Sequence, residues 1–191
     1  MNADIPNDMP AGTPDMLIYY GHISLTMTCL RFPVDGYVLR AATDADREFV
    51  MNLMRESILL SVPETEMRHS DLWIDDIMDV TSIAMDGNMM RSETFVLEDL
   101  NKERAGILWM GISRDQFTCE GTGYLLGLSV TEGLRGKGLG RALVGCARDW
   151  CREHGLLSLT LNVGSTNASA KAFYDRLGFE ERSTVMRRRF L

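Results

Sequence analysis

A glycine-rich turn in the second half of the chain has the residue types and spacing that bind an anion. An apolar run, residues 124–130, enters the turn, and a segment with apolar residues at helical spacing leaves it. We therefore expect the turn at the N-terminus of a helix, where unpaired amides and the helix dipole favour negative charge. The glycines expose those amides and basic side chains add positive charge. The turn reads Arg135-Gly136-Lys137-Gly138-Leu139-Gly140-Arg141.

The spacing of these glycines shows which of three phosphate-binding sequence patterns the turn can match. A P-loop requires G-x-x-x-x-G-K-[ST], but Gly138 follows Lys137 at the place of the Mg²⁺-binding hydroxyl. The dinucleotide fingerprint requires G-x-G-x-x-G, a spacing that the glycines do not have. The pattern R-x-x-G-x-G is met by Arg135, Gly138 and Gly140. Because glycine-rich turns also occur where a chain simply bends, the turn alone leaves its ligand open.

A second group of residues lies near the C-terminus, after an alternating strand-like segment at 156–163. It runs from Asn167 through Ala170 to Tyr174 and ends in Gly178-Phe179. Its order and spacing resemble the signature N-x-x-A-x-x-x-Y-x-x-x-G-F of the GCN5-related N-acetyltransferases (GNAT), and the turn resembles the acyl-CoA pyrophosphate loop of that family. The resemblance in motifs covers residues 123–180. Before residue 123 it extends only to the order of elements.

The resemblance implies transfer of an acetyl group from acetyl-CoA to a primary amine, by direct attack in a ternary complex. The strand end before the turn would pair its backbone with the pantetheine amides, and an N–H near Ser129 or Val130 would face the thioester oxygen. Tyr174 would protonate the leaving thiolate, although a core aromatic is the alternative interpretation. The implied cofactor-binding residues are Leu128, Ser129, Val130, Arg135, Gly136, Lys137, Gly138, Leu139, Gly140, Arg141 and Asn167.

The general base and the acceptor amine have no readable signature. Tyr124 occupies the region where some family members place a glutamate, and Glu98, Glu120, His69 or a water chain stay open. The acidic residues between 56 and 76 fit a solvated helix face better than a site. A cysteine route is not indicated, because Cys146 and Cys151 lie on a predicted helix without a histidine at pairing distance.

Two rival functions remain at this point. A non-catalytic acyl-CoA-binding regulator would keep the turn and would need neither an acceptor pocket nor the Tyr174 hydroxyl. A nucleotide-binding module is disfavoured by the missing P-loop hydroxyl.

Composition and charge agree with one soluble domain. The chain has 191 residues, 45% of them hydrophobic and 25% charged, which is ordinary for a globular protein. A net charge of −7 disfavours nucleic-acid and anionic-membrane binding and suits a cationic amine. The four cysteines form no C-x-x-C pair or metal cluster, so we expect no metal, and with no signal sequence or membrane span we expect a cytoplasmic protein.

The predicted elements form a mixed α/β domain over residues 37–191, preceded by an N-terminal extension. Residues 1–15 are expected to be a tail, and 16–32 a hairpin or an extra strand, which could also supply a homodimer contact. The acyl-CoA N-acyltransferase (GNAT) fold that the resemblance implies is a mixed, mostly antiparallel sheet of about six to seven strands with helices on both faces. We predict strands at 37–42, 94–100, 106–113, 124–130, 156–163 and 179–190, and helices after 43, over 64–85, after the turn and after 167.

Overall fold

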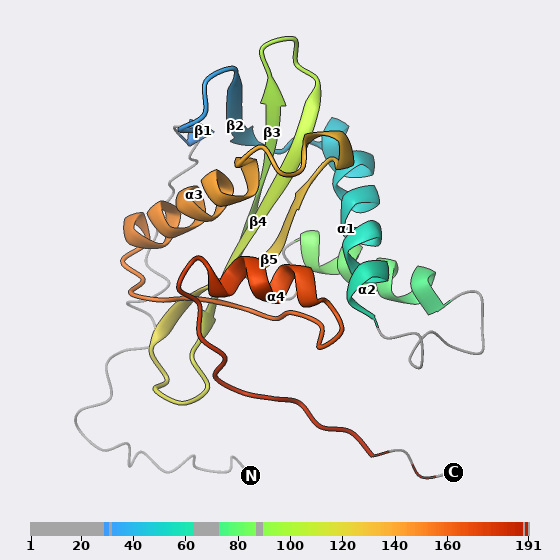
Figure 1. Cartoon of the computed structure of the whole chain (residues 1–191), viewed down its shortest axis with the longest axis vertical. Coiled ribbons are helices and arrows are strands. Elements are labelled where there is room, and N and C mark those ends of the chain that lie inside the picture. Colours follow the sequence, from blue (N-terminus) through green and yellow to red (C-terminus); the bar gives the residue numbers. More distant parts are fainter. Residues whose placement is uncertain (1–28, 31, 63–72, 87–89, 189, 191) are drawn as a thin grey trace, which may run out of the picture.

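The computed structural model of the chain describes residues 29–30, 32–62, 73–86, 90–188 and 190 (Figure 1). Its strands are β1 (Cys29–Leu30), β2 (Tyr37–Ala41), β3 (Ser92–Asp99), β4 (Arg104–Arg114), β5 (Gly121–Val130) and β6 (Leu159–Leu161). Its α-helices are α1 (Arg47–Ser61), α2 (Trp73–Met85), α3 (Leu139–Glu153) and α4 (Ala168–Asp175). Short 3-10 turns, η1 (Asp44–Asp46) and η2 (Glu132–Leu134), precede α1 and α3.

All the described strands belong to one six-stranded sheet in the order β1-β2-β3-β4-β5-β6. The strands from β1 to β5 pair antiparallel, and β6 pairs parallel with β5. This confirms the predicted mixed and mostly antiparallel sheet. Strand β1 lies at the outer edge beside β2, where an added strand from the N-terminal extension was expected, and residues 1–28 of that extension lie outside the described part.

Helices cover both faces of the sheet, and β4 runs through the middle. Successive side chains of a strand point to opposite faces. Leu108 and Met110 therefore pack in the cluster that contains α3, while Ile107 and Trp109 pack in the cluster that contains α1. All four are at most 2% exposed. The strand predicted at 106–113 is thus a central strand, buried on both faces.

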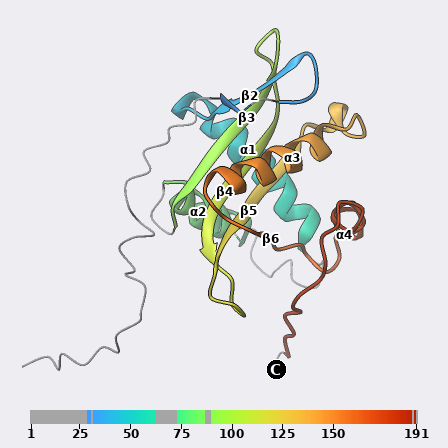
Figure 2. The ribbon, with the colours of Figure 1, turned by 90° about the vertical axis from the view of Figure 1, so that its left-hand side faces the viewer.

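The prediction of a closing strand at residues 179–190 is wrong. After α4 the described residues form no strand, and in Figures 1 and 2 the segment runs from α4 away from the sheet. Charged residues fill positions 180–182 and 187–189 of this segment, so neither face of a strand there would bury enough apolar area to offset the ordering of the chain. Arg182 instead pairs with Asp115 in the turn between β4 and β5, and Val185 is 95% exposed.

Two other boundaries differ from the prediction, each for a local reason. The run from Leu59 to Pro63 predicts a break in the first helix. Helix α1 instead continues through Leu59 and ends at Ser61, because Val62 precedes a proline and takes an extended conformation. The strand predicted at 156–163 shortens to β6, which pairs only with the first part of β5. The first half of the helix predicted over 64–85 lies outside the described residues.

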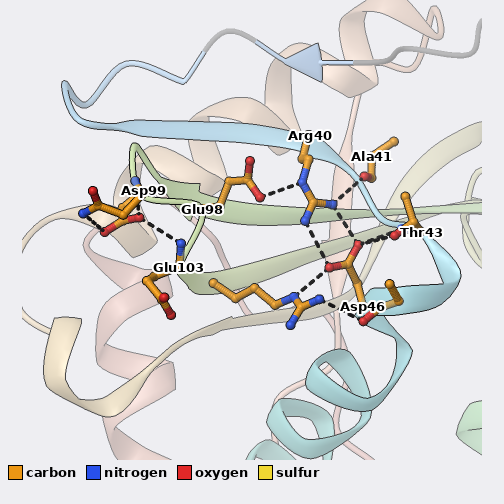
Figure 3. A network of polar contacts seen from close by, with 10 residues as sticks. Arg40, Ala41, Thr43, Asp46, Glu98, Asp99 and Glu103 are labelled. Carbon is orange, nitrogen blue, oxygen red and sulfur yellow. Dashed lines mark hydrogen bonds and ion pairs between the residues drawn. The ribbon is translucent and has the colours of Figure 1, made fainter.

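A polar network fixes the start of α1 against three strands (Figure 3). The carboxylate of Asp46 is 1% exposed and accepts hydrogen bonds from Arg40 at 2.8 and 3.0 Å and from Arg104 at 2.8 Å. It also accepts from the backbone N–H and the hydroxyl of Thr43, both at 2.8 Å, so Thr43 and Asp46 form a capping arrangement at the start of α1. Arg40 binds Glu98 of β3 as well, at 2.7 Å. These hydrogen bonds hold the pKa of Asp46 well below its usual range.

Candidate functional site

A β-bulge lies in β5 just after the residues that pair with β6. Trp109 pairs with Gly127, but the next residue of β4, Met110, pairs with Leu125, so Leu126 is an extra residue in β5. Pairing with β6 covers only residues 123–125 of β5. Within the described ranges, the half of β5 after the bulge therefore has a strand partner on the β4 side alone.

The bulge also decides which backbone groups face this open edge. The N–H of Thr131 donates to the carbonyl of Ala105 at 3.0 Å, so residues 131, 129 and 127 direct their amides toward β4. The N–H and C=O groups of Leu128 and Val130 then face the open edge. Arg135 agrees with this assignment, since its Nε donates to the Val130 carbonyl at 2.9 Å. Two backbone N–H groups were expected near the thioester, those of Ser129 and Val130. The N–H of Ser129 faces β4, so the donors on the open edge are the N–H groups of Val130 and Leu128.

The glycine-rich turn follows directly after this edge. Gly136 and Gly138 have φ of +79° and +84°, in the left-handed region that favours glycine, and Gly138 is the N-cap of α3. The first amides of α3 have no carbonyl of their own helix to bind. Lys137 and Arg141 are exposed and have no side-chain partner among the described residues. The local sequence thus builds an anion-binding helix terminus beside an open strand edge.

The second motif lies against the first. Asn167 caps α4 as predicted, since its Oδ1 accepts from the N–H of Ala170 at 3.0 Å. The ring of Phe173 lies next to the start of α3, because a Cβ at Gly140 would meet it at 3.5 Å. The helix that carries Asn167 and Tyr174 is therefore adjacent to the glycine-rich turn.

Tyr174 lies at the margin of the α3-side core. Its ring makes edge contacts with Phe173 and Phe179, at centroid distances of 5.1 and 5.3 Å. Burial raises the pKa of Tyr174 to about 12. The phenol is thus protonated at neutral pH, and its hydroxyl has no hydrogen-bond partner in the described part of the chain.

Helix α1 contacts both the glycine-rich turn and the second motif, through side chains that the sequence pattern does not single out. Nδ2 of Asn167 donates to the hydroxyl of Ser61, the last residue of α1, at 3.2 Å. Arg135 pairs with Glu56 of α1 at 3.4 Å. The sequence offers no signal for Ser61, and Glu56 was interpreted as part of a solvated face, because these contacts join residues far apart in the chain.

The candidate bases are not brought to the open edge as a group. Glu98 is bound to Arg40 in the network at the start of α1, Glu120 is exposed in the turn before β5, and His69 lies outside the described residues. Burial raises the pKa values of Cys146 and Cys151 to about 11, which leaves both thiols protonated and weakly nucleophilic. The described residues contain no cluster of His, Cys, Asp or Glu that could hold a metal ion. No described helix has the length and apolar character of a membrane span.

Comparison with known proteins adds a family assignment. Residues 53–179 match the model described as Acetyltransferase (GNAT) family. The chain is 35% identical over 96 residues to streptothricin acetyltransferase of Streptomyces lavendulae, covering 49% of this chain and 48% of that protein. It is 43% identical over 58 residues to mycothiol acetyltransferase of Beutenbergia cavernae, covering 30% and 20%. The matched stretch thus spans half or less of the length of these relatives.

The same fold occurs in solved structures of low sequence identity. AAC(6')-Iy, in complex with the bisubstrate analog CoA-S-monomethyl-acetylneamine, matches with a TM-score of 0.55 and 17% identity. The match covers 81% of this chain and 98% of that one. At this identity the likeness establishes the architecture alone.

Proposed function

Because this chain belongs to the GNAT acetyltransferase family, we propose that it transfers an acetyl group from acetyl-CoA to a primary amine by direct attack in a ternary complex. One observation carries this proposal: the open edge of β5 after the bulge runs directly into the anion-binding turn at the start of α3. Acetyl-CoA consists of an extended pantetheine arm joined to a pyrophosphate. An open strand edge can bind the arm, and an anion-binding turn can bind the pyrophosphate. The AAC(6')-Iy structure with a CoA analog supports the same choice of cofactor.

The cofactor would be held mainly by backbone groups. Leu128 and Val130 would pair with the pantetheine amides as an added strand does, with Ser129 between them. The amides of residues 136–141 would bind the pyrophosphate, with Lys137 and Arg141 supplying charge. Asn167 would hold the start of α4 beside the arm.

The reaction needs a donor for the oxygen that becomes negative as the amine attacks. The N–H of Leu128 or Val130 would supply it from a fixed strand edge, and one such donor is worth roughly 2.7–4 kcal/mol in acyl transfer. The C–N bond forms as the C–S bond breaks, and the sulfur leaves as a thiolate. The amine nitrogen must also lose a proton, and the chain offers no single residue that we assign to that step.

Tyr174 would act on the departing sulfur. A thiol has a pKa of about 8.5, and burial raises the pKa of Tyr174 to about 12. Complete proton transfer from the phenol to the thiolate is therefore uphill, so Tyr174 would stabilise the leaving group chiefly by donating a hydrogen bond. The phenol keeps its proton throughout the neutral range and would serve this role without a narrow pH optimum.

Thermal unfolding with acetyl-CoA, CoA, ATP and NAD in parallel tests the cofactor. A ligand at 100 times its dissociation constant adds about 2.7 kcal/mol of stability. Stabilisation by both CoA forms, and not by ATP or NAD, is the expected result. Absence of any CoA effect would remove the proposal.

Release of free thiol from acetyl-CoA in the presence of primary amines then tests catalysis. It separates the enzyme from a non-catalytic acyl-CoA-binding regulator, which would be stabilised by both CoA forms and would release no thiol with any amine.

A further inference from the structure

Helix α4 carries Tyr174 but has no fully buried residue of its own. Its start is tied to the end of α1 by the hydrogen bond between Asn167 and Ser61, and the ring of Phe173 lies next to Gly140 at the start of α3. A helix in a protein is stabilised mainly by the packing of its apolar face. Because that packing is shallow in α4, the contacts at its two ends gain weight in fixing where Tyr174 lies.

The chain folds back on Tyr174 directly after α4. Gly178 has φ of +84°, in the left-handed region that ends a helix, and the N–H of Phe179 donates to the carbonyl of Tyr174 at 3.1 Å. The ring of Phe179 then makes an edge contact with the ring of Tyr174, at a centroid distance of 5.3 Å. The position of Phe179 therefore limits where the phenol ring can lie.

Three residues later, Arg182 anchors this segment to the turn between β4 and β5. Its guanidinium binds both carboxylate oxygens of Asp115, and its Cζ lies 4.9 Å from the centroid of the Phe117 ring. The side chain of Asp115 is 7% exposed, and its Oδ1 also accepts from the backbone N–H groups of Phe117 and Thr118, each at 2.9 Å. The hydrogen bond from Thr118, followed by those from Arg182 and Phe117, lowers the pKa of Asp115 to about 2. The carboxylate is thus charged throughout the neutral range and is held in place by its own turn.

The neighbouring contacts of this segment are weaker. Glu181 pairs with Lys171 of α4 at 3.6 Å, but these side chains are 62% and 41% exposed, and such pairs contribute little. Further along, Val185 is 95% exposed. Of the two ion pairs, only that of Arg182 has a buried partner, so it is the contact that fixes the segment and, through it, Phe179.

We propose that Asp115 and Arg182 are positioning residues for Tyr174. Their ion pair holds Phe179 against the phenol ring and so keeps the Tyr174 hydroxyl directed at the leaving sulfur. This inference rests on the proposed function, in which Tyr174 donates a hydrogen bond to that sulfur. Neither member of the pair lies in the glycine-rich turn or in the open half of β5, so the pair should act on turnover and not on cofactor binding.

Arg182→Gln tests the pair. It should lower kcat for thiol release about tenfold with the KM for acetyl-CoA unchanged, because a small displacement of one catalytic group slows the reaction without removing a binding contact. Arg182→Lys retains the charge but not the two-pronged geometry, so its kcat should lie between those of the glutamine variant and the wild type. Glu181→Gln is the matched control, since it removes only exposed contacts of the adjacent residue and should leave kcat within about twofold.

The decisive measurement repeats Arg182→Gln in a protein that already carries Tyr174→Phe. If the pair acts through the Tyr174 hydroxyl, the double variant should have the same kcat as Tyr174→Phe alone, because the group to be positioned is absent. A further loss of about tenfold in the double variant would assign the ion pair to general stability and overturn the inference.

The remaining outcomes separate folding, positioning and the proposed function. Thermal unfolding shows whether each variant is folded. If Arg182→Gln is not, Asp115→Asn takes its place, since it keeps an acceptor oxygen for the N–H groups of Phe117 and Thr118 and removes the charge. An unchanged kcat in a folded variant would overturn the inference and leave the proposed function standing. A wild-type protein that releases no thiol with any amine would overturn the proposed function, and the inference with it.

Discussion

Replacing Asp46 with asparagine should destabilise the whole domain, because Asp46 joins the start of α1 to β2 through Arg40 and to β4 through Arg104. The substitution keeps the shape of the side chain and one acceptor oxygen but removes the charge. It leaves Arg40 and Arg104 beside a neutral amide whose NH₂ group faces donors. Removal of one partner from a buried ion pair costs about 3–5 kcal/mol.

The exposure of the partners sets the expected size of the loss. Asp46 is 1% exposed, but Arg40 and Arg104 are 27% and 39% exposed and can be rehydrated. We therefore expect the lower end, about 3 kcal/mol. For a chain of this length that corresponds to a decrease in Tm of roughly 6–12 °C. Urea unfolding followed by circular dichroism measures the free energy of unfolding directly.

The pH dependence gives a second and independent signature. The hydrogen bond from Arg40, with those from Thr43 and Arg104, lowers the folded-state pKa of Asp46 below the unfolded value of about 3.9. A group with a lowered folded pKa contributes stability above its unfolded pKa, and that contribution is lost as the pH falls toward the folded pKa. The difference between wild type and Asp46→Asn should thus be constant from about pH 7 to about pH 5 and shrink below about pH 4.

An exposed ion pair supplies the matched control. Asp75→Asn removes a carboxylate that pairs with Arg55 at 2.9 Å, with side chains 57% and 44% exposed. Such pairs contribute at most about 1 kcal/mol, so this variant should unfold close to the wild type. The reasoning about Asp46 is refuted if the two variants lose equal stability, or if the loss at Asp46 does not change with pH.

Three further predictions concern the proposed site. Gly138→Ala should weaken acetyl-CoA binding about 5- to 30-fold in calorimetry, because alanine disfavours φ of +84° by about 1–2 kcal/mol, whereas Gly140→Ala meets only an ordinary ring contact at 3.5 Å and should bind normally; equal losses would contradict the anion-turn geometry. Tyr174→Phe removes one hydrogen-bond donor to the leaving sulfur and should lower kcat about 100-fold with acetyl-CoA affinity retained, and unchanged turnover would exclude the leaving-group role. Asn167→Ala removes both the α4 cap and the hydrogen bond to Ser61 and should lower the free energy of unfolding, measured in urea, by about 1 kcal/mol or more, while Ser61→Ala, which retains the cap, should cost less; equal losses would show that the cap adds nothing beyond the contact with α1.

The anion turn and its flanking helices could be predicted from sequence because their determinants are local. The left-handed backbone at the N-cap of α3 favours a glycine at position 138, and Asn167 caps α4 through a residue three positions away. The spacing of apolar residues in α3 likewise predicts which face of the helix is buried. Such features depend on neighbours in the chain and leave a direct trace in the sequence.

The parts that sequence could not give depend on register and on distant contacts. Only the pairing with β4 identifies Leu126 as the extra residue of β5 and so assigns Leu128 and Val130 to the open edge. The packing of Met54 over Gly127 joins α1 to β5 and has no local signature. The strand predicted at 179–190 failed because β-propensity alone does not supply a buried face.

The two contacts of Arg135 have a consequence for the order in which the substrates bind. Its Nε donates a hydrogen bond to the Val130 carbonyl at 2.9 Å, on the edge that the pantetheine would use. Its Nη2 pairs with the carboxylate of Glu56 at 3.4 Å. A cofactor that takes the Val130 carbonyl would displace Arg135 toward the pyrophosphate and leave Glu56 as an unpaired carboxylate.

We therefore expect a cationic amine to be attracted to α1 only after the cofactor has bound, which is an ordered kinetic mechanism. CoA should then inhibit competitively against acetyl-CoA and noncompetitively against the amine. Competitive inhibition by CoA against both substrates would instead mean that the amine binds the enzyme without the cofactor. The pairing of Arg135 with Glu56 would then not control the order of binding.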